Sequence, residues 1–117
     1  MFNTLTRRIA AVLCASFLFV GAGEITSRAA NVPPSIVEVK IDNFTFAPMD
    51  LTVAVGTTVK WINRDDIPHT VVSEDKTTFK SKAMDTDESF SYTFNQPGTY
   101  TYFCSIHPKM VAKIIVK

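Results

Sequence analysis

From residue 36 onward, apolar and polar residues alternate in short runs that turn residues separate, and no stretch has helical periodicity. In the run SFSYTF at 89–94, every second residue is aromatic. The alternation predicts strands at residues 36–41, 51–55, 58–63, 69–73, 89–94, 99–104 and 111–117. Residues 74–88 are charged and poorly patterned, so we expect a long loop there, with room for one edge strand near Phe79.

The first 29 residues have a different pattern. Arg7 and Arg8 precede an uncharged run at 9–23, and small residues follow near 27–30. This order is typical of a secretory signal peptide, so we expect a signal peptide at 1–29, or a cut after Gly23, and a mature domain at 30–117. A membrane anchor is the competing interpretation, but this run is shorter than the roughly 20 apolar residues of a spanning helix.

Removal of the signal peptide changes two properties of the chain. The net charge falls from +1 to −1, with 9 basic and 10 acidic residues, and Cys104 becomes the one remaining cysteine. A nearly neutral chain without a basic stripe is not typical of a nucleic-acid-binding protein. Small exported domains usually depend on disulfides, and a single cysteine cannot form one within the chain. A bound metal ion could replace that stabilisation.

Seven or eight short strands with frequent turns predict an all-β fold, an antiparallel β-sandwich. An immunoglobulin-like sandwich is an alternative, because Tyr102 lies two residues before Cys104, as in the tyrosine corner of that fold. The mature chain cannot form the inter-sheet disulfide of immunoglobulin domains, which disfavours this alternative.

The last two predicted strands direct two sulfur atoms inward. Cys104 shares a strand face with Tyr102, and Met110 shares one with Ile114. His107 lies in the loop that joins these strands, and His69 lies near the end of another predicted strand. Thiol, thioether and imidazole groups are therefore expected to meet at one end of the sandwich.

Each of these residues has an ordinary explanation when it is taken alone. A buried cysteine behaves as a small apolar residue, an inward methionine fills a core, and a loop histidine is exposed. Together, however, a thiolate, two imidazoles and a thioether suit copper that cycles between Cu(I) and Cu(II). Zinc fits less well, because a thioether is a poor ligand for it. A Cys–His thiol enzyme would need an exposed sulfur, whereas the strand phase buries Cys104.

The stretch CSIHPKM at 104–110 resembles the ligand loop of the cupredoxins, the small blue copper proteins. The two-residue gap between His107 and Met110 resembles the short-loop amicyanin type. Further similarities follow in the order of that family. They are VGT at 55–57, WINR at 61–64, PH at 68–69 and PGTY at 97–100, and the resemblance covers roughly 36–117.

The resemblance implies that His69, Cys104 and His107 bind one copper ion in a trigonal plane, with Met110 as the weak axial ligand. It also implies a Greek-key β-sandwich of about eight strands that carries single electrons in the periplasm and is not an enzyme. The partners would be redox proteins, a dehydrogenase or a c-type cytochrome, met in brief encounters. We expect a monomer that binds no nucleic acid and does not insert into the membrane after signal removal.

Two other functions stay open at this point. One is a copper-binding or delivery module on the same fold that does not shuttle electrons, and the other is a zinc-stabilised or metal-free interaction domain. A carrier would pass electrons through the edge of His107, which we expect at the surface among apolar residues. They are Ile106, Pro108 and Pro68, with Ile67 or Met49.

The sequence departs from the family pattern close to the predicted ligands. Thr70 follows the first histidine, where an asparagine commonly connects the two ligand segments. Ala112 replaces a usual glycine, and Ile106 replaces the common proline between the cysteine and the second histidine. The question for the structure is therefore whether Thr70 still connects the segment of His69 to the segment of Cys104.

Overall fold

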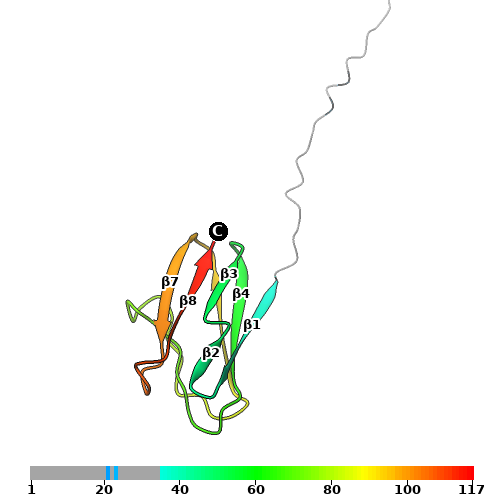
Figure 1. The fold of residues 1–117 in the computed structure, drawn as a ribbon. Helices are drawn as coiled ribbons and strands as arrows, with labels where there is room; N and C mark the ends of the chain where they lie inside the picture. Colours follow the sequence, from blue (N-terminus) through cyan, green and yellow to red (C-terminus); the bar gives the residue numbers. More distant parts are fainter. Residues whose placement is uncertain (1–20, 22, 24–34) are drawn as a thin grey trace, which may run out of the picture. The chain divides into compact units, whose positions relative to one another are not determined.

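The fold is described from a computed structural model, which describes residues 21, 23 and 35–117 (Figure 1). The predicted signal peptide at 1–29 lies outside the described residues except for Gly21 and Gly23, so its removal stays a prediction. Within the described part of the chain, no helix has the length and apolar character needed to cross a membrane.

Two four-stranded sheets form an all-β sandwich, as predicted. One sheet has the strand order β2-β1-β4-β6 and the other has the order β3-β8-β7-β5. In Figure 1, β7 and β8 lie side by side, in orange and red, at the left of the domain. The strands are β1 (Ile36–Asp42), β2 (Thr45–Ala47), β3 (Asp50–Val53), β4 (Thr57–Asn63), β5 (Val72–Ser73), β6 (Ser89–Phe94), β7 (Gly98–Phe103) and β8 (Val111–Val116).

The sheets are mixed, which refines the expected antiparallel pairing. β1 pairs with β4 in parallel, and β3 pairs with β8 in parallel. The pairs β1–β2, β4–β6, β5–β7 and β7–β8 are antiparallel. Alternating sequences do not distinguish the two arrangements, because side chains alternate between faces in both. The parallel pairs join strands that are distant in sequence, and that pairing is set by the packing of the whole domain.

Local differences from the predicted strands occur next to the loops. β2 is a three-residue strand that was not predicted, since it is too short to show a period. The predicted strand at 69–73 contracts to β5, and His69 makes only an isolated bridge to Met84. The loop at 74–88 contains no strand near Phe79. It contacts β5 through the bridge from Val72 to Lys80 and through the Ser73 amide, which donates to the Phe79 carbonyl at 3.0 Å.

The predicted strand phases are confirmed by burial. Trp61, from β4, is fully buried between aromatic side chains and stacks on Phe79 with a centroid distance of 5.6 Å. Phe79 therefore fixes the loop at 74–88 to the core. In β8, Ala112, Ile114 and Val116 are buried, so the last strand directs the face that begins with Met110 into the sandwich.

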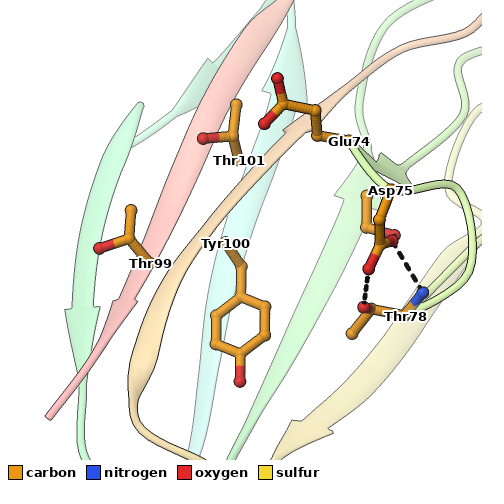
Figure 2. A pocket seen from close by; sticks show the side chains of 7 residues that line it. Glu74, Asp75, Thr78, Thr99, Tyr100 and Thr101 are labelled. Atoms are coloured by element: carbon orange, nitrogen blue, oxygen red, sulfur yellow. Dashed lines mark hydrogen bonds between the residues drawn. The ribbon is translucent and has the colours of Figure 1, made fainter.

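The loop after β5 is built around the carboxylate of Asp75. It accepts hydrogen bonds from the hydroxyl of Ser73 at 2.6 Å, from the amides of Thr77 and Thr78, and from the hydroxyl of Thr78. The Ser73 hydroxyl, followed by the Thr78 donors, holds the pKa of Asp75 well below its usual range. Figure 2 shows this turn beside the cleft that Tyr100 lines. Because donors of the turn already occupy the carboxylate, Asp75 stabilises the loop.

Candidate metal centre

The predicted ligand loop joins the ends of two neighbouring strands. Cys104 directly follows β7, and Met110 directly precedes β8. The Cys104 amide donates to the Met110 carbonyl at 3.1 Å, and the Met110 amide donates to the His107 carbonyl at 2.9 Å. These two bonds close the loop, so its residues are held against the end of the core. His69 reaches the same place from the segment between β4 and β5.

The structure brings three of the predicted ligand residues together. Ligand atoms of His69, Cys104 and His107 all lie within 4.8 Å of one another. The Cys104 Sγ is 3.8 Å from Nδ1 of His69 and 3.7 Å from Nδ1 of His107. A sulfur at about 2.3 Å and a nitrogen at about 2.0 Å from one ion, separated by about 120°, would lie about 3.7 Å apart. The spacing therefore fits three donors around one metal ion.

Met110 is joined to two of these residues through its backbone. Its side chain is buried, with 6% of its surface exposed, and its backbone is hydrogen-bonded to both Cys104 and His107. A thiolate and two imidazoles, to which Met110 would add a thioether, are the donor set that suits copper.

The environment of Cys104 favours the thiolate that binds a metal. Burial raises the pKa of the thiol, but the hydrogen bond from the Thr70 amide, together with the contacts that the sulfur makes with His69 and His107, outweighs burial and lowers the pKa to about 6. The Thr70 amide lies 3.4 Å from the sulfur. Because the thiolate, not the thiol, is the metal ligand, the folded chain presents Cys104 in the form that binds an ion at neutral pH.

Asp65 fixes the ring of His69. Its Oδ2 accepts a hydrogen bond from His69 Nε2 at 2.9 Å and another from the Phe44 amide at 3.0 Å. The bond from His69 and then the bond from Phe44 lower the pKa of Asp65 below its usual value. Since Nε2 is engaged in this way, Nδ1 of His69 is free to face the Cys104 sulfur. Such outer partners orient histidine ligands and set their tautomer.

Asn63 organises the loop that carries Asp65 and His69. It lies at the end of β4 and is fully buried. Its Nδ2 donates to the carbonyls of Ile67 and Met84, both at 2.8 Å, and its Oδ1 accepts from the Asp65 amide at 2.9 Å. Asn63 therefore supplies hydrogen-bond partners to the loop that precedes His69 and to Met84, the bridge partner of His69. Sequence analysis noted it within WINR but gave it no role.

Thr70 connects the two ligand segments in place of the usual asparagine. Its Oγ1 accepts a hydrogen bond from the Ser105 amide at 2.7 Å and shares another with the Ser105 hydroxyl at 2.8 Å. Its backbone amide points at the sulfur of Cys104. The departure from the family pattern therefore preserves the connection with a smaller side chain. Ala112 is also accommodated, since it is a buried residue of β8 and its φ is not positive.

Phe44 is a further residue at this site that sequence analysis missed, as it also missed Asp65. Its ring is perpendicular to both imidazoles, with centroids 5.7 Å from that of His69 and 5.0 Å from that of His107. It lies in the short connection between β1 and β2, where an aromatic residue is usually an ordinary surface residue. No pattern in the sequence pointed to it, because β2 is too short to show a period.

The exposed surroundings of His107 are apolar, as expected for Ile106 and Pro108. His107 is partly exposed, and Ile106 is 47% exposed. A shallow pocket in front of this ring is lined by Phe44, Ile106, His107, Pro108, Lys109 and Met110. Met49, also expected here, is 56% exposed and lines a neighbouring pocket together with Phe44.

Several known proteins are similar to this chain in both sequence and fold. The family described as copper binding proteins, plastocyanin/azurin family, matches residues 35–117. Amicyanin of Paracoccus versutus is 38% identical over 95 residues, which cover 76% of this chain and 70% of that protein. Amicyanin of Paracoccus denitrificans is 33% identical over 121 residues, which cover 93% and 92%. The structure of a purple cupredoxin from Nitrosopumilus maritimus matches with a TM-score of 0.65 and 32% identity, covering 69% of this chain and 99% of that one.

Proposed function

This chain belongs to the plastocyanin/azurin family of copper-binding proteins, and on that premise we propose that it is a type 1 copper protein that carries single electrons between redox proteins. The observation that carries the proposal is the position of the Cys104 sulfur, 3.8 Å and 3.7 Å from the Nδ1 atoms of His69 and His107. Thiolate coordination of Cu(II) gives this class of site its colour and its redox behaviour.

The proposed ligands are Nδ1 of His69, Sγ of Cys104 and Nδ1 of His107, with the thioether of Met110 as the weak axial ligand. Copper bound by them would take up and release one electron. His69 and Cys104 are fully buried and Met110 nearly so. The strands and the surrounding hydrogen bonds hold these donors in one arrangement, which limits the rearrangement that accompanies a change between Cu(II) and Cu(I).

The hydrogen bonds around the donors support a carrier over an enzyme. The Asp65 carboxylate is held by His69 and Phe44, and the Thr70 hydroxyl is held by Ser105. Both groups position ligands, so neither is available as an acid or a base for a substrate. The partly exposed ring of His107, set among apolar side chains, is the route by which we expect electrons to enter and leave.

Two finer parts of the proposal concern location and partners. The signal-peptide pattern at 1–29 supports export to the periplasm. The small apolar surface around His107 is suited to brief encounters with a dehydrogenase or a c-type cytochrome. We propose that the mature chain acts there as a monomer.

The experiment is copper loading of the mature chain, followed by visible spectroscopy and voltammetry. We expect an intense blue Cu(II) form and a reversible one-electron couple, with both lost in Cys104→Ser. Met84→Leu is the matched control, since Met84 is buried next to the same site and is not a proposed ligand. A colourless copper complex would favour the delivery module, and failure to bind copper would overturn the proposal.

A further inference from the structure

The backbone of Phe44 has a conformation that a bulky residue seldom adopts. Asn43 and Phe44 connect β1 to β2 with φ values of 49° and 57°. Asparagine tolerates this left-handed region, whereas a bulky side chain there is an outlier. In two-residue hairpin connections the second position usually belongs to glycine. Non-glycine residues in strained conformations tend to cluster at functional sites, such as active sites and ligand-binding segments.

Burial does not explain an aromatic side chain at this position. Phe44 is 51% exposed, in contrast to Phe46 two residues later, which is 1% exposed and belongs to the core. The contacts of Phe44 are instead with the proposed ligands. Its ring is perpendicular, at 88°, to the rings of both His69 and His107. Perpendicular aromatic rings at these distances attract each other.

The two histidines are held by different means. His69 has the Asp65 carboxylate on its Nε2 atom. Within the described residues His107 has no comparable partner, because its one side-chain hydrogen-bonding contact joins Nδ1 to the Cys104 sulfur. His107 is also partly exposed and lies on a loop. Its orientation therefore depends on packing, and the aromatic rings that pack against it are those of Phe44 and His69, each with a centroid distance of 5.0 Å.

We infer that Phe44 is a positioning residue, which holds the imidazoles of His69 and His107 with their Nδ1 atoms toward Cys104. The left-handed turn places the ring over both histidines, and the Phe44 amide is tied to the Asp65 oxygen that orients His69. The left-handed conformation at Phe44 therefore positions the ligands and does not stabilise the hairpin. This inference rests on the proposed copper site.

The test is Phe44→Gly in the mature chain, because this change removes the ring and relieves the backbone strain together. We expect the apoprotein to unfold at the same temperature as the native apoprotein or at a higher one. We expect the copper dissociation constant, measured by competition with a chelator, to rise about tenfold. Opposite effects on apoprotein stability and copper affinity distinguish a positioning residue from a structural one.

Two variants serve as controls. Phe44→Tyr keeps the ring and the turn, so it should retain native copper affinity. Asn43→Gly places a glycine at the neighbouring left-handed position of the same turn and removes no contact with a histidine, so it should leave copper affinity unchanged. Native affinity in Phe44→Gly, or a loss of apoprotein stability as large as its loss of affinity, would overturn the inference.

A second measurement does not depend on copper. Side-chain NMR relaxation of the His107 imidazole in the apoprotein should show a more mobile ring in Phe44→Gly than in the native chain. Equal mobility would overturn the inference. If the native chain bound no copper at all, the proposed function would fail, and this measurement would still decide whether Phe44 orders His107.

Discussion

The Ser105 amide donates a hydrogen bond of 2.7 Å to Oγ1 of Thr70. This bond joins the residue after Cys104 to the residue after His69, so the two segments that supply the proposed ligands cannot shift independently. The Thr70 amide lies 3.4 Å from the Cys104 sulfur in the same arrangement. One residue thereby sets the spacing between the segments and also provides a donor to the thiolate.

Replacement of Thr70 by valine should isolate the contribution of the hydroxyl, which also lies 3.7 Å from the Cys104 sulfur. Valine keeps the shape and the amide but removes the hydroxyl, which leaves the partly buried Ser105 amide without its acceptor. We expect the free energy of unfolding of the apoprotein to fall by about 1–3 kcal/mol, as measured by denaturant titration. Thr70→Asn restores a side-chain oxygen and should recover most of the loss. A valine variant as stable as the native chain would show that the bond does not stabilise the fold.

Asp65 should influence copper affinity without touching copper. Removal of its carboxylate in Asp65→Ala frees Nε2 of His69, so the ring can turn away from Cys104. Loss of such an outer partner typically weakens metal binding by about 10- to 100-fold, and we expect a loss of this size in a chelator competition. Asp66→Ala is the matched control, because Asp66 is adjacent and exposed. Equal losses in both variants would indicate a general effect of charge.

Cys104 should make the apoprotein more stable as the pH rises. Its pKa is 9.0 as an ordinary thiol and about 6 in the folded chain. The folded state therefore binds fewer protons, and the stabilisation is complete above about pH 9 and lost as the pH falls through about 6. Denaturant titrations between about pH 5 and about pH 9 should show a stability difference between native and Cys104→Ala apoprotein that grows with pH. A difference that stays constant over this range would contradict the shift.

The features that could be predicted from the sequence are those with a local pattern. Alternation in β7 and β8 placed Cys104 and Met110 on the inner face because each strand has a period of two, and both side chains are buried. The types of donor atom then indicated copper, although the sequence does not give the distances between these atoms. The meeting of His69 with Cys104, 35 positions away, was expected from the family resemblance, and the structure confirms it.

The features that could not be predicted depend on contacts between distant segments. Phe44 stands in a turn next to a three-residue strand, so no period revealed its position. The hydrogen bond from His69 to Asp65 joins residues four positions apart, but the sequence does not show which of its several carboxylates accepts it. Thr70 was recognised as a departure, yet its effect depended on whether Ser105 would face it. Each of these contacts depends on how the loops fold back over the core.

Met110→Leu should change the reduction potential and preserve the colour. Leucine has nearly the volume of methionine, so the buried position should tolerate it, with a change in apoprotein stability below about 1.5 kcal/mol. Removal of a weak axial sulfur alters the potential of a copper site that three stronger ligands still hold. We therefore expect a blue protein whose potential in cyclic voltammetry differs from that of the native chain. Met84→Leu makes the same change at another buried methionine near His69, so its potential should stay native. Complete loss of the blue absorption in Met110→Leu, or equal potentials in the two variants, would show that Met110 is not the axial ligand.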